Sequence, residues 1–205
     1  MDIIIACEYS AVMRDAFRAR GHNAWSCDIL PCDGDPRFHI QGNVLDYLHS
    51  GWDQMIAHPP CTRLTLAGIR WLHTHTPPPG KTWAQMWAEL LDAVWFYRQV
   101  RAAPIKRKGI ENPKMHKIAE NMIQVGPRQV VQPWWFGVPE FKGLGFETYG
   151  LPELKPTNML TPPKPGTKEH GEWSKVHRAS PGPQRWKERS TTRRGVAEAV
   201  AAQWG

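Results

Sequence analysis

The chain has few cysteines, no Cys-x-x-Cys pair and no long apolar run. Only four of its 205 residues are cysteines, and all four lie in the first third. This pattern argues against a disulfide framework or a zinc ribbon and favours a reducing cytosol. The histidines near Cys61 fit no standard zinc spacing, so we expect no metal. No apolar run approaches the roughly 20 residues that a membrane span needs, and the amino terminus does not fit a signal peptide, so no membrane contact is expected.

Internal repeats are also lacking, and the length allows one full core rather than two. The 19 prolines and 17 glycines indicate many loops. A net charge of +7 and a pI near 9.4 favour a polyanionic partner. Eleven tryptophans offer flat surfaces that suit stacking on bases, although most of them are expected to pack in the core.

Short apolar runs alternate with helical periodicity along the chain, which is typical of an α/β fold. Ser10 is the expected N-cap of the first helix, and Gly21 is its expected stop. The expected strands are 2–7, 22–27, 55–57, 105–110, 129–132 and 144–149, and the expected helices are 11–20, 64–72, 82–101, 114–125 and 195–204. These elements predict a mostly parallel sheet with helices on both faces.

The segment 82–101 has the clearest helical pattern in the chain. Its apolar residues form a broad stripe that should pack on the sheet. We therefore expect its tryptophans, Trp83, Trp87 and Trp95, to lie in the core.

One cysteine follows a rigid corner at the end of a short strand. Met55 to Ala57 suits a buried strand, and Pro59 and Pro60 then end it because neither can donate to a sheet ladder. Cys61 comes next. In an open α/β sheet, ligands bind at the carboxyl ends of the strands, so this thiol is a candidate nucleophile. A small buried cysteine with no chemical role is the alternative interpretation.

Two further strand ends carry acids. Glu111 follows the strand 105–110 within Glu111-Asn112-Pro113, and Asp28 closes the strand 22–27. An acid at the second position of such a half-fold can bind ribose hydroxyls, although Asp28 also fits a plain surface acid. No glycine occurs between Cys7 and Arg20, so this first loop is not a diphosphate cradle. A cofactor without a diphosphate would need none.

Pro59-Pro60-Cys61 and Glu111-Asn112-Pro113, in this order, resemble the DNA (cytosine-5) methyltransferases, which have a Pro-Pro-Cys loop and a Glu-Asn-Val loop. The resemblance implies a Rossmann-like methyltransferase fold that uses S-adenosylmethionine. It also implies that Cys61 adds to carbon-6 of cytosine and that Glu111 supports protonation of ring nitrogen-3. Lys142 stands where the family has the arginine of a Pro-Gln-x-Arg segment and is the third expected catalytic residue.

The same resemblance implies the binding positions. Glu8-Tyr9-Ser10 occupies the place of the family's first cofactor loop, here without its glycines, and Asn43 stands where the family has an acid that accepts from adenine. The expected cofactor-binding residues are Cys7, Glu8, Tyr9, Ser10, Asp28, Ile29, Asn43 and Pro59, and the expected substrate-binding residues are Pro60, Asn112 and Pro113.

The chain departs from the family in size. We expect a catalytic domain over 1–150, a Pro-rich basic arm over 151–194 and a closing helix over 195–205. The arm is too short for a sequence-reading domain. Three explanations remain open: loose sequence preference through phosphate contacts, action on single-stranded DNA, or recognition by a partner subunit. A compact enzyme of this kind would suit a phage.

Two other functions stay open. The chain would be a DNA-binding module if catalysis had been lost, or it would modify cytosine nucleotides or transfer a group other than methyl. Basic residues in the arm favour a polymer over a nucleotide.

Overall fold

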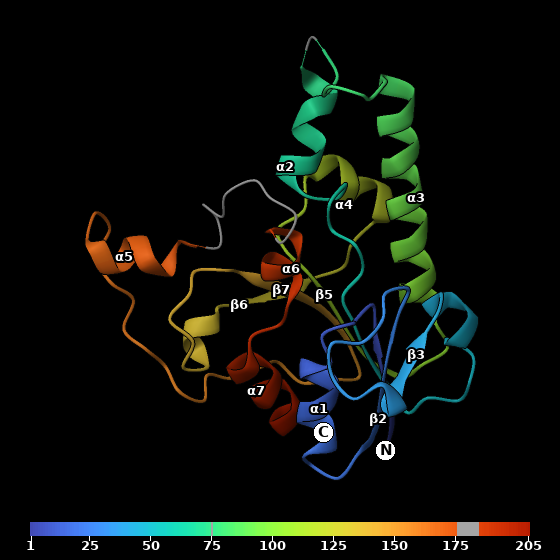
Figure 1. The fold of residues 1–205 in the computed structure, drawn as a ribbon, viewed down its shortest axis with the longest axis vertical. Helices are drawn as coiled ribbons and strands as arrows, with labels where there is room; N and C mark the ends of the chain where they lie inside the picture. Colours follow the sequence, from blue (N-terminus) through green and yellow to red (C-terminus); the bar gives the residue numbers. More distant parts are fainter. Residues whose placement is uncertain (75, 176–184) are drawn as a thin grey trace.

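The computed structural model describes residues 1–74, 76–175 and 185–205 and contains one seven-stranded sheet (Figure 1). The strands are β1 (Asp2–Ala6), β2 (Asn23–Asp28), β3 (His39–Gln41), β4 (Gln54–Ala57), β5 (Arg107–Asn112), β6 (Arg128–Val131) and β7 (Leu144–Tyr149). Their order is β3-β2-β1-β4-β5-β7-β6. Strands β1 to β5 pair in parallel, and β7 runs antiparallel to both β5 and β6. The predicted α/β fold with a mostly parallel sheet is therefore confirmed.

The direction in which successive strands are added to the sheet changes between β1 and β4. The chain first builds β1, β2 and β3 toward one edge and then returns to place β4 on the other side of β1. At such a switch point, the loops after the two neighbouring strands diverge and leave a crevice at their carboxyl ends. This places the loop after β1 beside the loop after β4.

Helices cover both faces of the sheet, and β1 contributes apolar side chains to both. Ile4 faces a cluster with residues of α3 (Trp83–Ala102) and α4 (Lys117–Ile123). Ile3 and Ile5 face the opposite cluster, with residues of α1 (Val12–Arg18) and α7 (Arg194–Trp204). The remaining helices are η1 (Pro36–Phe38), η2 (Val44–Tyr47), α2 (Leu66–Ile69), η3 (Arg70–His73), η4 (Pro133–Trp135), α5 (Lys168–Trp173) and α6 (Arg185–Ser190).

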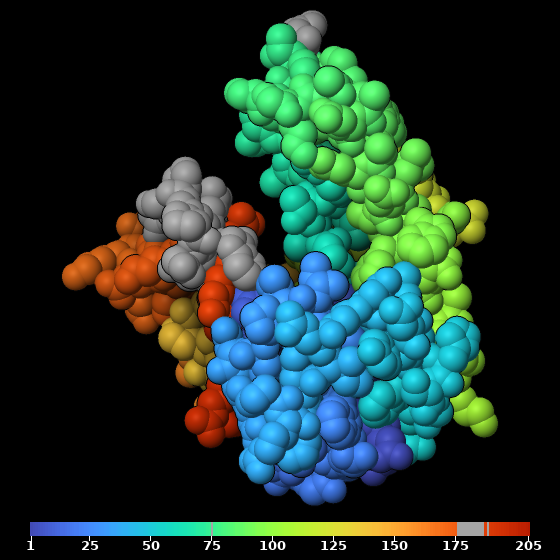
Figure 2. Space-filling view, turned by 45° about the vertical axis from the view of Figure 1, so that its right-hand side comes forward, coloured from blue at the N-terminus to red at the C-terminus, as the bar shows by residue number. Residues whose placement is uncertain are grey.

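The expectation that the α3 tryptophans lie in the core was wrong. Trp87 is 42% exposed and Trp95 is 56% exposed, and Trp83 is only partly buried. The reason is the position of α3, which rises with α2 beyond the sheet and forms a separate lobe (Figures 1 and 2). The sheet can cover only one side of a helix that projects in this way. Figure 2 also shows a recess between this lobe and the red segment of α6.

The segment 151–194, the expected Pro-rich basic arm, contains the short helices α5 and α6. Helix α5 buries Trp173, and Leu154 packs into the core beside α7. Residues 176–184 of this segment lie outside the described part of the chain, and the division into domain, arm and closing helix stays a prediction. Within the described ranges, no helix combines the length and apolarity that crossing a membrane would require.

Candidate active site

The loop after β4 presents Cys61 at the carboxyl edge of the sheet. Strand β4 is fully buried, Pro59 is buried and Pro60 is exposed, so the chain turns outward across the two prolines. The Cys61 carbonyl then accepts from the N–H groups of Leu64 and Thr65 at 2.9 and 3.2 Å. These bonds close a tight turn that fixes the backbone of the cysteine.

Helix α2 lies directly against this turn. A side chain at Gly68 would place its Cβ only 1.7 Å from the carbonyl oxygen of Thr62, the residue after Cys61. Only glycine permits this approach. The position of the loop after β4 that carries Cys61, the nucleophile loop, therefore depends on α2.

Glu111 lies inside β5 rather than after it, because the strand extends to Asn112. The buried Asn112 amide donates to the carbonyl oxygen of Pro59 at 2.9 Å and so ties the end of β5 to the nucleophile loop. Pro113 follows, and its carbonyl accepts from Arg128 at 3.4 Å. This bracing places Glu111 and Cys61 on neighbouring strand ends.

The charges around the Cys61 sulfur oppose one another. Burial raises the pKa of the Cys61 thiol, and the negative charge of Glu111 raises it further. Lys142 acts in the opposite direction and lowers it. The structure thus brings together all three side chains that the sequence suggested for catalysis, and the charge of Glu111 disfavours the thiolate form of Cys61.

Lys142 is held from the carboxyl-terminal part of the chain. Its ammonium group donates to the carbonyl oxygen of Arg189 in α6 at 2.6 Å. Burial lowers the pKa of Lys142, while the Glu111 carboxylate favours its charged form. Arg189 also lowers the pKa of Cys61, a contribution that sequence reasoning missed because no motif links a cation in the arm to this thiol.

His58 lies between two carboxylates. Its Nδ1 atom is 3.3 Å from Oε2 of Glu111, and both side chains are about 85% buried, with 15% and 14% exposed. The other carboxylate is Glu8: burial raises the pKa of its side chain, and a charge on His58 acts in the opposite direction. The hydrogen bond of the His58 ring goes to Glu111.

The first loop is built around Glu8 and not around Ser10. Ser10 does not cap α1, because the N-cap residue is Ala11, in a left-handed conformation with φ 64°. The Glu8 carboxylate instead accepts from the N–H groups of Met13 and Arg14 at 2.7 and 3.1 Å, and from the Ser10 hydroxyl at 3.2 Å. The chain's own carboxylate fills the position at which nucleotide-binding folds hold phosphate.

Tyr9 and Cys7, the other expected cofactor-binding residues of this loop, lie in different surroundings. Tyr9 is buried, and its hydroxyl lies 3.1 Å from Ser190 Oγ and 3.3 Å from Thr191 Oγ1, so it contacts the segment that also holds Lys142. Cys7 has a left-handed φ of 59°. Burial, with the charge of Asp28, raises the pKa of the Cys7 thiol and so disfavours its thiolate form.

The second strand end presents Asp28 and Ile29. One Asp28 oxygen accepts from the Leu30 N–H at 2.9 Å, and burial raises the pKa of the carboxyl. Ile29 is 73% exposed, an unusual position for a large apolar side chain next to a half-buried acid. Asn43 caps η2, and its amide oxygen, the atom expected to accept from adenine, already accepts from the Leu45 N–H at 3.2 Å.

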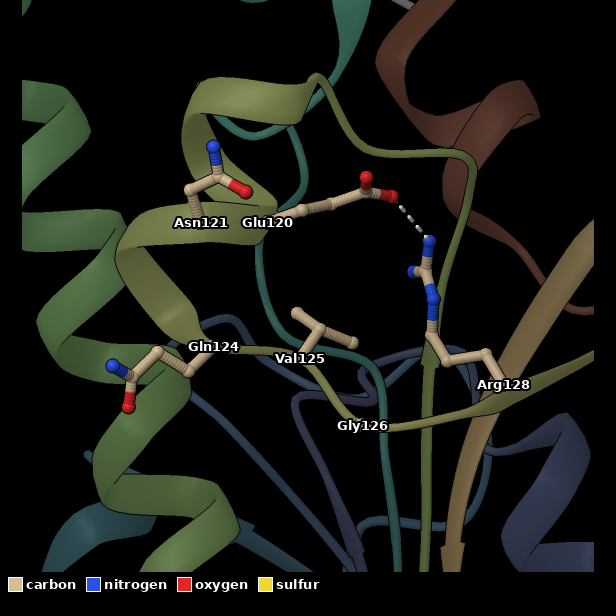
Figure 3. A pocket seen from close by; sticks show the side chains of 6 residues that line it. All are labelled: Glu120, Asn121, Gln124, Val125, Gly126 and Arg128. Carbon is tan, nitrogen blue, oxygen red and sulfur yellow. Dashed lines mark hydrogen bonds and ion pairs between the residues drawn. The ribbon is translucent and has the colours of Figure 1, made fainter.

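A cavity of about 590 Å³ lies elsewhere, between α4 and the start of β6 (Figure 3). An ion pair of 3.2 Å between Glu120 and Arg128 lies along its wall. The residues that line it are Glu120, Asn121, Gln124, Val125, Gly126 and Arg128. None of them is one of the three expected catalytic residues, Cys61, Glu111 and Lys142. Among the described residues, no cluster of histidine, cysteine and acidic side chains has the arrangement of a metal site.

No family model matches the chain. No curated protein matches it either. Among solved structures, it is similar to an E. coli protein that is provisionally described as a DNA modification methyltransferase encoded within a prophage, with a TM-score of 0.43 and 15% sequence identity. The similarity covers 78% of this chain and 52% of that protein, so this chain spans about half the length of the neighbour.

Proposed function

We propose that the protein is a DNA methyltransferase that transfers a methyl group from S-adenosylmethionine to carbon-5 of cytosine through a covalent Cys61 adduct. The observation that carries the proposal is the convergence of Cys61, Glu111 and Lys142. A thiol, a carboxylate and a buried cation at neighbouring strand ends match what this reaction needs. The Pro-Pro-Cys and Glu-Asn-Pro sequences support the same conclusion.

The chemistry follows from the weak nucleophilicity of cytosine carbon-5. The Cys61 thiolate adds to carbon-6 and forms a carbon–sulfur bond, and the displaced electron pair is taken up by the ring as nitrogen-3 gains a proton from Glu111. Carbon-5 then has enamine character and would take the methyl group that bound S-adenosylmethionine supplies, with S-adenosylhomocysteine as the leaving group. Loss of the carbon-5 proton to water then breaks the carbon–sulfur bond and releases the Cys61 thiolate, and nitrogen-3 returns its proton to the Glu111 carboxylate, which restores the ring.

Glu111 and Cys61 assist each other in this scheme. The charge of Glu111 raises the pKa of Cys61, so protonation of Glu111 removes a charge that suppresses the thiolate. The protonated form is also the form that can donate to the ring. Lys142 lies close to both groups and offsets the negative charge that the thiolate brings.

The first loop fits S-adenosylmethionine better than a dinucleotide. Glu8 occupies the amino end of α1, so a diphosphate there would meet a buried carboxylate. S-adenosylmethionine carries no phosphate, and when bound it supplies an activated methyl group. Asp28 would hold its ribose hydroxyls, and the exposed Ile29 would pack against its adenine. Asn43 is the weakest of these assignments because its amide oxygen is engaged as a cap.

DNA is the proposed substrate, and a base in a duplex must leave the stack before Cys61 can reach it. Helix α2 follows the nucleophile loop and exposes 65% of Leu66. In η3, the Arg70 guanidinium lies 4.9 Å from the Trp71 ring centroid, a pairing that suits base stacking. A partner subunit that reads sequence remains part of the proposal because the arm is short.

The test is mass spectrometry of nucleosides from DNA incubated with S-adenosylmethionine and the protein. Duplex and single-stranded substrates should be compared, with wild type, Cys61→Ala and Cys32→Ala as the matched thiol control. We expect 5-methylcytosine with wild type and Cys32→Ala and none with Cys61→Ala. A Cys61→Ala protein with full activity would overturn the covalent mechanism. No product on either substrate, with DNA binding intact, would favour a binding module.

A mechanistic prediction concerns Glu111. Glu111→Gln should lower the methylation rate by about two to four orders of magnitude, since an amide cannot deliver the proton. Glu153→Gln, at an exposed position, serves as the control. An oligonucleotide with 5-fluorocytosine, which cannot lose a carbon-5 proton, should trap the wild-type adduct for detection by mass.

A further inference from the structure

His58 has a defined partner on only one side of its ring. Nδ1 contacts Oε2 of Glu111 at 3.3 Å. Nε2 is buried, and among the described residues it has no hydrogen-bond partner. The backbone of His58 is fixed as well, because its N–H donates to the carbonyl oxygen of Ala6 at 2.9 Å. The sheet therefore fixes the backbone of His58, and Glu111 fixes one side of its ring.

We infer that His58 is a positioning residue that donates from Nδ1 to Oε2 of Glu111 and so directs the catalytic proton of Glu111 onto Oε1. This inference rests on the proposed function. It identifies a residue outside the Pro-Pro-Cys and Glu-Asn-Pro motifs that would determine how Glu111 acts on the cytosine ring.

The direction of the hydrogen bond follows from the chemistry of the two groups. An ionised carboxylate can only accept hydrogen bonds, so the Nδ1 atom beside it must carry the hydrogen. This holds for the neutral Nδ1–H tautomer and for imidazolium alike. When Glu111 takes up a proton, Oε2 is already engaged as an acceptor. The proton therefore goes to Oε1, and the carboxyl group cannot rotate to exchange the two oxygens without losing the bond.

Glu8 supports the same arrangement from the neighbouring strand end. Its carboxylate is fixed by two backbone N–H groups of α1 and by Ser10. It attracts a positive charge on His58. The two acids and the histidine come from the ends of β1, β4 and β5, which are neighbours in the sheet.

The kinetic test uses two amide replacements that differ in where they place an N–H. His58→Asn puts its amide near the Nδ1 position and should keep the methylation rate within about threefold of wild type. His58→Gln puts its amide near the Nε2 position, and we expect kcat to fall by roughly 10- to 100-fold with the KM for DNA unchanged. In a Glu111→Gln background, His58→Gln should cause no further loss. Equal rates for the two variants, or a loss that persists without Glu111, would overturn the inference.

A second measurement does not require activity. Nitrogen NMR of the imidazole in the wild-type protein should show the hydrogen on Nδ1, whereas His58 in Glu111→Leu should change to the Nε2–H form that is favoured in water. An Nε2–H ring in wild type, or an unchanged ring in Glu111→Leu, would contradict the contact. If wild type makes no methylated base but the NMR result holds, the proposed function fails while the His58–Glu111 bond stands.

Discussion

The Cys61 sulfur lies among groups that act on it in opposite directions. Burial and Glu111 disfavour the thiolate, whereas Lys142 and Arg189 favour it. Cys27 has no cation among the causes of its shift: burial, with the charges of Asp28 and Asp46, raises its pKa to about 12. The presence of two cations beside one thiol distinguishes Cys61 from a cysteine that merely fills space.

This balance predicts the pH dependence of Cys61 alkylation. Because its pKa is raised, Cys61 should react slowly with iodoacetamide at neutral pH and faster as the pH increases. Glu111→Gln removes a charge that raises the pKa, so the midpoint should move to lower pH. Lys142→Met removes a charge that lowers it, so the midpoint should move to higher pH.

Peptide mapping by mass spectrometry separates Cys61 from the other three cysteines. The buried Cys27 provides an internal control and should stay unmodified in every variant. A Cys61 midpoint that does not change in Glu111→Gln would mean that the two side chains do not interact, which would also remove the main support for the proposed reaction.

Side-chain roles could be predicted from sequence only where a motif names them. Pro-Pro-Cys and Glu-Asn-Pro identify Cys61 and Glu111 because each stands at the end of an apolar run. The role of Glu8 could not be predicted, since a carboxylate that caps a helix from before its first turn looks like any other loop acid. Arg189 lies far from Cys61 in the sequence, and only the folded chain brings them together.

At the scale of elements, the contact between α2 and the nucleophile loop leaves the least room for an added side chain. Gly68→Ala would place a methyl group 1.7 Å from the Thr62 carbonyl oxygen, so the loop must move. We expect adduct formation to fall on the order of 10²-fold, because a displacement near 1 Å has effects of this size. The neighbouring Ala67 is exposed, and Ala67→Ser should leave the rate unchanged. A Gly68→Ala enzyme with a normal rate would show that the loop position does not limit the reaction.

The packing of α7 on the sheet depends on another glycine. A Cβ at Gly109 in β5 would lie 2.7 Å from Cζ3 of Trp204, which is completely buried. Gly109→Ala should therefore lower the free energy of unfolding by about 1–3 kcal/mol. Trp204→Phe removes the ring atoms that approach Gly109, so the double variant should lose less than the sum of the two single changes. Urea unfolding measures all three, and strict additivity would contradict the contact.

Element types were predictable because strands and helices differ in apolar period, and the strand and helix sequences each follow one period. The position of β7 could not be predicted, because no local sequence signal specifies that a strand inserts between β5 and β6 in the antiparallel direction. The exposure of the α3 tryptophans was mispredicted for a related reason. An apolar stripe indicates a buried face only if another element reaches it, and the sheet does not extend as far as the outer part of α3 (Figure 1).

At the scale of the whole molecule, a charge of +7 does not mean that every cation is available for DNA. Lys187 pairs with Asp33 at 2.8 Å, and Arg193 binds Glu140 through two nitrogens at 2.5 and 2.9 Å. These cations hold α6 and the start of α7 against the rest of the protein. Arg189, in contrast, is exposed and forms none of the ion pairs found in the described part of the chain. It lies next to the candidate site and is the best placed of these residues to meet a phosphate.

Arg189→Ala should therefore weaken DNA binding equally for unrelated sequences and reduce its salt dependence. For a duplex, the logarithm of affinity falls with the logarithm of salt concentration by about 0.9 for each phosphate contact. Losing one contact should lower that slope by about 1. Arg20→Ala is the matched control, because Arg20 follows α1 and lies at the opposite edge of the sheet from Cys61. Fluorescence anisotropy over a salt series gives both slopes. A flat salt response in wild type would contradict phosphate contacts altogether, and an equal loss in both variants would mean that only net charge matters.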